Sequence, residues 1–350
     1  MKILILKPSS LGDVVQAIPV ARLIKDHCPK AQVHWWLNSE LVPLLEGDPG
    51  IDRIVPFERR RWGRPSGLLL AATEIRRLRK ERYDWVLDLQ GLARSALVGW
   101  LSNGGRFVGL DDPREGAPAL HDISVPRPSE TTHAVDWYLS VLPHLGVPVH
   151  RNFQWMQEYP AAAREVAAQA GDSGPVWIAF QPGARWENKR WPAAHFAELA
   201  SKILTHNHDW RIAILGGKSD EGLGAEIQRV AGSRALDLTG KLSLPGMVEW
   251  IRRSSLLVTN DTGPMHVAAA LQRPVVGLFG PTNPARTGPY GQTDQTLRIQ
   301  LPCAPCLKSH CNHREFMACL TRITPDRVFH AVRSRLESGH RASCPPTSAA

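Results

Sequence analysis

The chain begins with the sequence MKILILKPSSLGDVVQAIPV (residues 1–20), and this stretch decides the fold. Residues 3–6 are a short apolar run, which predicts a buried strand. A polar loop leads from it into residues 14–27, where Val14, Ile18 and Ala21 recur on one face of a helix. A strand, a loop and a helix in this order predict one unit of a parallel sheet that helices cover on both faces.

The same alternation of strands and helices recurs along the chain and predicts two domains. Further strands are expected at 33–37, 51–56, 85–87 and 106–109, and then at 176–180, 211–215, 256–259 and 275–279. Further helices are expected at 66–82, 94–101, 193–205, 221–231, 244–253 and 264–271. The irregular stretch 151–160 reads as a linker. We therefore predict an α/β protein of two doubly wound, Rossmann-like domains, 1–155 and 156–338, with a cleft between them and a disordered tail at 339–350.

Composition narrows the class of protein. The 350 residues are 43% hydrophobic and 21% charged, which is typical of globular proteins and not of disordered ones. No apolar run approaches the length that spans a bilayer, and the four apolar residues before Lys7 are too few for a secretory signal. These features predict a soluble protein of the cytoplasm. The net charge of +9 fits nucleic acid, an anionic membrane surface or an acidic substrate equally well.

The loop after the first strand, residues 7–13, has the composition of an anion site. Ser10 and Gly12 allow backbone N–H groups to face an anion at the start of a helix. Asp13 has two interpretations: a helix cap, or a carboxylate that accepts a proton from a hydroxyl nucleophile. The loop lacks the G-x-G-x-x-G pattern, which disfavours a nicotinamide cofactor.

Two loops of the second half also follow strands. In residues 181–192, Gly183 permits close backbone approach, and Lys189 with Arg190 places cations where a phosphate would bind. The alternative is a solvated basic loop. In residues 216–221, a glycine pair precedes Glu221, which could bond ribose hydroxyls, although such a pair is often only a turn.

The most specific loop is NDTGPMH at residues 260–266, ahead of an alanine-rich helix. Asp261 or Thr262 would cap the helix, and Gly263 would leave its first N–H groups open. The helix dipole and these N–H groups favour a diphosphate. His266 lies one turn into the helix, and it is either directed at that anion or a histidine of the core.

Four cysteines near the C-terminus form the pattern C-x2-C-x4-C-x7-C: Cys303, Cys306, Cys311 and Cys319. A disulfide framework is not expected in a reducing cytoplasm. Four thiols within so short a segment could instead bind a structural zinc ion.

Together these loops resemble glycosyltransferase family 9, the ADP-heptose:lipopolysaccharide heptosyltransferases. The matching motifs, in the order of the family, are SSLGD (9–13), YDWVLDLQGL (83–92), KRWP (189–192), NDTGPMH (260–266) and GPT (280–282). The resemblance implies a GT-B fold of two facing Rossmann-like domains, with the acceptor on the N-terminal and the nucleotide sugar on the C-terminal domain. It also implies inverting transfer from ADP-heptose, with no metal or other cofactor needed for catalysis.

The resemblance also implies roles for individual residues. Asp13 would be the general base, and Lys189 would be the catalytic cation beside the leaving diphosphate. Residues implied in donor binding are Ser10, Gly12, Gly183, Ala184, Lys189, Glu221, Asp261, Thr262, Gly263 and His266. Residues implied in acceptor binding are Lys7, Arg60, Arg61, Arg64 and Gln90.

The implied acceptor is Kdo-lipid A or heptosyl-Kdo-lipid A. Gln90-Gly91 and the basic stretch 59–62 resemble heptosyltransferase I, whereas Asn260-Asp261 and Pro264-Met265 resemble heptosyltransferase II. Both acceptors carry anionic groups at the cytoplasmic face of the inner membrane, so the +9 charge fits peripheral contact there better than nucleic acid.

Three other readings stay open on the sequence alone. Twelve tryptophans and the positive charge prompt a nucleic-acid-binding protein, but residues such as Trp35, Trp85 and Trp250 are scattered and form no basic stacking stripe. A GT-B-fold sugar epimerase shares the architecture. A non-catalytic nucleotide-binding module follows if Asp13 is only a cap.

Overall fold

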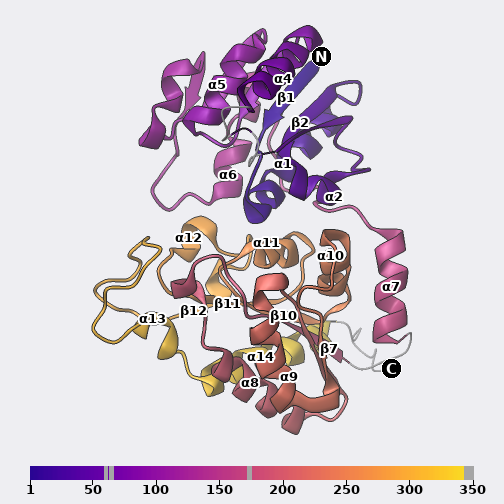
Figure 1. Cartoon of the computed structure of the whole chain (residues 1–350), viewed down its shortest axis with the longest axis vertical. Helices are drawn as coiled ribbons and strands as arrows, with labels where there is room; N and C mark the ends of the chain where they lie inside the picture. The colour runs from indigo at the N-terminus through magenta and orange to yellow at the C-terminus, as the bar shows by residue number, and fades with distance from the viewer. Residues whose placement is uncertain (59–61, 63–66, 172–175, 343–350) are drawn as a thin grey trace, which may run out of the picture. The chain divides into compact units, whose positions relative to one another are not determined.

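The computed structural model describes residues 1–58, 62, 67–171 and 176–342. The chain divides into two compact units, Met1–Gln157 and Glu158–Ala350. Each unit has its own parallel sheet with helices on both faces (Figure 1). This is the α/β, doubly wound architecture that the strand–helix alternation predicts.

The sheet of the N-terminal unit has, among the described residues, six strands in the order β3-β2-β1-β4-β5-β6, with every neighbouring pair parallel. The strands are β1 (Lys2–Leu6), β2 (Gln32–Asn38), β3 (Arg53–Phe57), β4 (Trp85–Asp88), β5 (Arg106–Leu110) and β6 (Ile123–Val125). In the centre of the sheet, Ile3 pairs with Val33 on one side and Trp85 on the other. The apolar run of β1 is fully buried because helices cover both faces.

The helices of this unit form two layers. They are α1 (Leu11–His27), α2 (Val42–Leu45), α4 (Gly67–Glu81), α5 (Ala93–Ser102) and α6 (Ala134–Leu139), with short 3-10 turns at Ser39–Leu41, Pro113–Glu115, Ala117–Leu120 and Leu142–Leu145. The chain moves from β1 to β2 in one direction and from β4 to β5 in the other. Right-handed crossovers then put α1 and α5 on opposite faces. In agreement, α1 contacts α6, and α4 contacts α5.

The sheet of the C-terminal unit repeats this topology, in the order β12-β11-β10-β7-β8-β9 among the described residues, again all parallel. The strands are β7 (Val176–Gln181), β8 (Trp210–Ile214), β9 (Ala235–Asp237), β10 (Leu256–Asn260), β11 (Val275–Phe279) and β12 (Thr296–Arg298). The helices are α7 (Pro160–Ala170), α8 (Ala193–His206), α9 (Glu221–Ala231), α10 (Leu244–Arg253), α11 (Gly263–Ala270), α12 (Pro284–Thr287), α13 (Ala318–Thr321) and α14 (Pro325–Ala342). Short 3-10 turns lie at Glu187–Lys189, Lys218–Asp220, Gly232–Arg234 and Thr293–Gln295.

Each sheet has one point where its connections diverge. In the N-terminal unit the chain leaves β1 towards β2 and leaves the adjacent β4 towards β5. In the C-terminal unit the adjacent strands β7 and β10 diverge in the same way. Ligands of doubly wound sheets bind at the carboxyl ends of such strands. The loops after β1, β4, β7 and β10 are therefore where the fold places a site.

The structure differs from the expectations at element ends and sheet edges. Helix α1 begins at Leu11 and not at residue 14, so Asp13 lies in its first turn and not in the loop before it. The three-residue edge strands β6, β9 and β12 were not predicted, because so short a run shows no periodicity. Helix α7 begins at Pro160, where we expected the linker to end. Helix α14 continues to Ala342, into the tail expected from 339, and residues 343–350 lie outside the described residues.

Candidate active site

Asp13 lies in the first turn of α1, directly after the central strand of the N-terminal unit. Its Oδ2 accepts hydrogen bonds from the Ser10 backbone N–H at 2.9 Å and from the Ser10 hydroxyl at 2.6 Å. Its Oδ1 lies 3.4 Å from the Tyr138 hydroxyl, and 40% of the side chain is exposed. Asp13 therefore completes the hydrogen bonding at the N-terminus of α1, and it also presents a carboxylate oxygen towards solvent. The Ser10 N–H, which we expected to face an anion, is used by Asp13.

Lys7 places a buried cation beside Asp13. Its Nζ donates to the Leu89 carbonyl at 2.8 Å, lies 4.0 Å from Asp13 Oδ1 and sits 4.5 Å from the centre of the Tyr138 ring. Burial lowers the pKa of Lys7, but Tyr138 and Asp13 outweigh burial and raise it above the ordinary value. Burial also raises the pKa of the Tyr138 hydroxyl. At neutral pH Lys7 is thus an ammonium and Tyr138 a neutral phenol.

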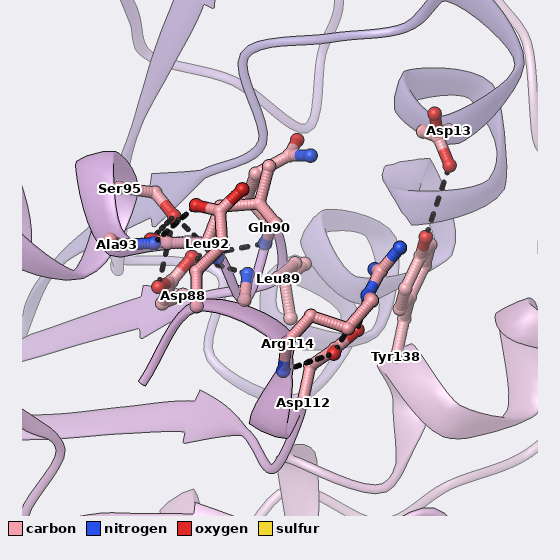
Figure 2. A network of polar contacts seen from close by, with 12 residues as sticks. Asp13, Asp88, Leu89, Gln90, Leu92, Ala93, Ser95, Asp112, Arg114 and Tyr138 are labelled. Carbon is pink, nitrogen blue, oxygen red and sulfur yellow. Dashed lines mark hydrogen bonds and ion pairs between the residues drawn. The ribbon is translucent and has the colours of Figure 1, made fainter. Parts of the chain in front are cut away.

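The loop after β4 is held by Asp88, which is fully buried. Its Oδ1 accepts the backbone N–H groups of Gln90 and Gly91, both at 3.0 Å, and its Oδ2 accepts the Ser95 hydroxyl at 3.1 Å (Figure 2). Oδ2 also lies 3.3 Å from Nε2 of His121. Because Lys7 binds the Leu89 carbonyl inside this loop, Asp88 fixes the position of Lys7 indirectly.

The structure adds Arg114, a residue that sequence reasoning missed. It follows β5, and its Nε and Nη2 bind the Asp112 carboxylate at 2.6 to 3.0 Å, while 72% of its side chain is exposed. Burial raises the pKa of Asp112, but the hydrogen bonds from Arg114 outweigh it and hold that pKa below the ordinary value. Figure 2 shows Arg114 on the Tyr138 side of the network. The signal for it was a basic residue in the loop that follows the predicted strand 106–109.

The expected acceptor residues are only partly visible. Arg60, Arg61 and Arg64 lie outside the described residues. Gln90 is in place after β4, and among the described residues its buried side-chain Oε1 accepts no hydrogen bond.

In the C-terminal unit, Lys189 and Asp261 form an ion pair between the loops after β7 and β10. The Lys189 Nζ lies 2.7 Å from Asp261 Oδ2, which also accepts the Thr282 hydroxyl at 2.6 Å. Lys189 is 18% exposed, and its Nζ lies 4.7 Å from the centre of the Trp186 ring. The two loops that the sequence singled out therefore meet, and their cation is already held in place by a carboxylate.

Asn260 fixes the two loops to each other. Its Oδ1 accepts the Trp191 N–H at 3.0 Å, and its Nδ2 donates to the Pro182 carbonyl at 2.7 Å. Because both partners flank Lys189 in the loop after β7, the buried Asn260 side chain positions that loop. This role was not predicted.

Helix α11 begins at Gly263 with Thr262 as its N-cap residue. The Thr262 side chain makes no capping hydrogen bond, so neither expected side-chain cap occurs, because Asp261 is engaged by Lys189 and Thr282. His266 is buried within the helix, at 8% exposure.

Gly183 lies against a protein carboxylate, and its role in donor binding stays a prediction. A Cβ at this position would lie 2.2 Å from Oδ2 of Asp220, so the close approach is to a protein carboxylate. Asp220 in turn accepts the Gly217 N–H at 2.9 Å. Ala184 is buried, and its carbonyl accepts Nε of Arg190 at 2.8 Å. Glu221 is exposed at the start of α9.

The four cysteines, which could bind a structural zinc ion, are not arranged as a ligand set in this structure. Among the described residues, no three or more His, Cys, Asp or Glu side chains are placed to hold a metal ion. Cys303, Cys306, Cys311 and Cys319 line one cavity of about 220 Å³, which His310, His313 and Lys308 also line together with apolar and amide side chains. Burial, with the other three thiols, raises the pKa of Cys319 to about 11.

Comparisons with known proteins identify the same family that the loop motifs resemble. The model of glycosyltransferase family 9 (heptosyltransferase) matches residues 72–316. The chain is 32% identical to lipopolysaccharide heptosyltransferase 1 of Pseudomonas aeruginosa, over 96% of this chain and 98% of that protein. It is 29% identical to lipopolysaccharide heptosyltransferase 2 of Salmonella typhimurium, over 96% of this chain and 99% of that protein.

A solved structure gives the same result. The ADP-heptose lipopolysaccharide heptosyltransferase II of Escherichia coli superposes with a TM-score of 0.77 at 25% identity, over 97% of this chain and 100% of that one. The family model covers well over half of the chain, and the relatives match nearly all of it. The chain therefore belongs to glycosyltransferase family 9, the heptosyltransferases, and is a glycosyltransferase of the GT-B fold.

Proposed function

We propose that this enzyme is heptosyltransferase I, which transfers heptose from ADP-heptose to Kdo-lipid A in the synthesis of the lipopolysaccharide inner core. The subtype is supported by the relative from Pseudomonas aeruginosa, a lipopolysaccharide heptosyltransferase 1 that is 32% identical over almost the whole chain. The observation that carries the chemistry is the half-exposed Asp13 carboxylate at the carboxyl end of the central strand.

Asp13 is proposed as the general base. An acceptor hydroxyl gives its proton to Oδ1 while its oxygen forms a bond to the anomeric carbon of heptose. The bond from that carbon to the diphosphate oxygen breaks on the opposite face, and ADP leaves with the electron pair. The configuration inverts because attack and departure occur on opposite faces. Ser10 orients the carboxylate by binding its other oxygen.

Lys7 and Tyr138 keep this base in place. Lys7 remains protonated because its pKa is raised, and it lies on the Oδ1 side of Asp13. Its bond to the Leu89 carbonyl joins the loops after β1 and β4. We assign Lys7 to positioning the base and the acceptor rather than to proton transfer.

On the donor side, Lys189 is proposed to stabilise the charge that develops on the leaving diphosphate. Asp261 and Thr282 hold the Lys189 loop in place before the donor arrives. The open N–H groups at the start of α11, from Gly263 onwards, would bind phosphate oxygens. We propose that ADP-heptose is the donor substrate. Because Lys189 and these N–H groups supply the positive charge, we also propose that no catalytic metal takes part.

On the acceptor side, exposed Arg114 is proposed to bind the acidic sugar, since a guanidinium suits the carboxylate of Kdo. Gln90, in the loop after β4, is the second proposed acceptor residue, and its Oε1 is buried in the structure without the acceptor. The net charge of +9 favours an anionic acceptor. Among the described residues, no helix is long and apolar enough to cross a bilayer. We propose that the enzyme works in the cytoplasm and reaches its lipid-linked acceptor at the inner face of the inner membrane.

Heptosyltransferase II is the second candidate. It is favoured by the 29% identity to lipopolysaccharide heptosyltransferase 2 of Salmonella typhimurium, again over nearly the whole chain. The acceptor would then be heptosyl-Kdo-lipid A.

One experiment separates the two candidates. Purified enzyme is incubated with ADP-heptose and either Kdo-lipid A or heptosyl-Kdo-lipid A, and the products are weighed by mass spectrometry. Addition of one heptose to Kdo-lipid A alone supports heptosyltransferase I. Addition to heptosyl-Kdo-lipid A alone assigns heptosyltransferase II, and addition to neither overturns the proposal.

A further inference from the structure

Helices α4 and α5 of the N-terminal unit expose large apolar side chains. Leu69 is 79% and Leu70 50% exposed on α4, while Leu97 is 48% and Trp100 57% exposed on α5. The two helices contact each other on the same face of the sheet (Figure 1). Four exposed large apolar side chains on two helices that pack together favour an interaction surface, whereas single ones do not. We call these four residues the α4–α5 patch.

The patch is not a by-product of poor packing. Both helices bury another face against the core, through Leu78 of α4 and Ala96 and Val98 of α5. Leu97 and Trp100 are three residues apart, so they lie side by side on the outer face of α5. Each helix therefore carries apolar side chains on its outer face in addition to the apolar face that packs against the core.

Basic residues continue the same outer faces. Arg76 comes seven residues after Leu69, and Lys80 comes four residues after Arg76. This spacing keeps all three on one stripe of α4. Further exposed cations are Arg77 and Arg79 on α4 and Arg94 on α5.

The acidic residues of α4 cancel only part of this charge. Glu74 pairs with Arg77 at 3.3 Å, and Glu81 is taken by Lys2 and Arg53 from neighbouring strands. The surface thus combines apolar side chains with a positive field.

We propose that the α4–α5 patch docks on a bilayer that contains anionic phospholipid. Leucine and tryptophan enter the boundary between headgroups and acyl chains, where an aromatic ring with a polar N–H is favoured. The basic side chains contact anionic headgroups, and their long aliphatic stems lie along the apolar surface. The choice of an anionic bilayer as the occupant rests on this combination of exposed apolar and cationic side chains.

This docking deepens the proposed function and rests on it for the identity of the acceptor. The first turns of α4 and α5 follow the carboxyl ends of β3 and β4, the edge of the sheet that carries Asp13 and Gln90. Contact at Leu69, Leu70 and Leu97 would hold this edge near the headgroup layer. A sugar on a lipid anchor would then be presented at the site without leaving the membrane.

The test is co-sedimentation of the full chain with vesicles of phosphatidylcholine alone or of phosphatidylcholine mixed with phosphatidylglycerol, whose negative surface potential attracts basic segments. Wild type is expected to bind only the anionic vesicles. Leu97→Ser/Trp100→Ser and Arg76→Glu/Lys80→Glu should each lower the partition coefficient by at least about tenfold, since apolar and charged contacts both contribute. Val230→Ser is the matched control, because Val230 is 51% exposed on α9 of the other unit.

Two further measurements keep the outcome unambiguous. Fluorescence quenching by brominated lipid should fall in Trp100→Phe, since Trp100 is the ring that enters the bilayer. Equal vesicle binding by wild type and Leu97→Ser/Trp100→Ser overturns the proposal. Self-association that these substitutions abolish, without vesicle binding, also overturns it, because the patch would then bind a second copy.

Failure of the docking is distinguishable from failure of the proposed function. Heptose transfer to a delipidated, water-soluble Kdo acceptor does not require a membrane. That activity should be the same in wild type and Leu97→Ser/Trp100→Ser. If wild type lacks it, the proposed function fails, whatever the vesicles show.

Discussion

Lys7 Nζ lies 4.0 Å from Oδ1 of Asp13 and donates a hydrogen bond to the Leu89 carbonyl, so one buried cation joins the loops after β1 and β4. These loops leave adjacent strands in opposite directions, and nothing in their local sequence holds them together. The proposed base and the proposed acceptor loop are therefore positioned by the same side chain. The first two predictions test this relationship.

Asp13→Asn is expected to lower kcat by roughly 100- to 10,000-fold, the usual contribution of a general base. Donor binding should persist, because Asp13 belongs to the N-terminal unit and the proposed diphosphate site to the other. The kcat is measured with ADP-heptose and Kdo-lipid A, and ADP-heptose affinity by calorimetry. Ser10→Ala is the control for the structural role, since it removes one bond to Asp13 but keeps the carboxylate. Turnover of Asp13→Asn at the wild-type rate would show that Asp13 only caps the N-terminus of α1 and is not the general base.

Lys7→Met is expected to lower kcat by roughly tenfold or more and to raise KM for the acceptor, since one positioned contact is typically worth this much. It also leaves the Leu89 carbonyl without its buried donor, which destabilises the fold by about 1–3 kcal/mol. Because the folded-state pKa of Lys7 is raised, its charged form stabilises the fold fully below pH 10.5, and this stabilisation is lost as pH rises through the higher pKa.

The readout is urea unfolding of wild type and Lys7→Met at pH 8 and pH 11. The difference in unfolding free energy between the two proteins should shrink at the higher pH. A difference that does not depend on pH, with unchanged acceptor KM, would contradict the role of Lys7.

Lys189→Ala should reduce turnover by roughly 10- to 1000-fold, the cost of losing one charge contact to the transition state. It should also expose an unpaired Asp261 to the incoming diphosphate, so donor affinity falls as well. Lys189→Ala/Asp261→Asn should regain part of the donor affinity but not the turnover. Lys202→Ala on α8 is the control, because that lysine pairs with Asp326 away from these loops. Kinetics equal to wild type would remove Lys189 from the site.

Much of the central architecture was predictable, because buried parallel strands are continuous apolar runs that the sequence displays directly. Residues 3–6, 176–180 and 275–279 are examples, and the structure places strands there. The edge strand Ile123–Val125 was not predictable, because its three residues are defined by pairing with β5 and not by their own pattern. Helix α7 was missed because its mostly alanine face gives little periodic signal.

Single loops were predictable as candidates, but their partners were not. The sequence marked Lys189 and Asp261 separately, yet their ion pair depends on the adjacency of β7 and β10. Arg114 escaped notice because its significance comes from Asp112 and from its place beside Tyr138. The cysteine spacing suggested ligands for zinc, whereas side-chain direction, which spacing does not determine, left no ligand arrangement among the described residues.

Gly183→Ala is expected to destabilise the C-terminal unit by about 1–3 kcal/mol, the usual cost of overpacking, because its Cβ would lie 2.2 Å from Asp220 Oδ2. The double variant Gly183→Ala/Asp220→Ala should be more stable than the sum of the two single variants predicts, since the clashing carboxylate is gone. Gly222→Ala is the matched control, because a Cβ there meets nothing within 4 Å and alanine favours the helix. Urea unfolding measures wild type, both single variants, the double variant and the control. Strict additivity would show that Asp220 is not the group that requires glycine.

Cys319 should react slowly with iodoacetamide, because burial and the neighbouring thiols raise its pKa to about 11. At pH 8 its thiolate fraction is then about 100-fold below that of a thiol with a pKa of 9, and the thiolate is the reacting species. The rate, followed by mass spectrometry of peptides, should keep rising about tenfold per pH unit from pH 8 to 10. Exposed Cys303 is the internal control. A plateau below pH 9 would contradict the raised pKa, and protection of all four thiols by one equivalent of zinc would show that the cysteines can rearrange into the ligand set that this structure lacks.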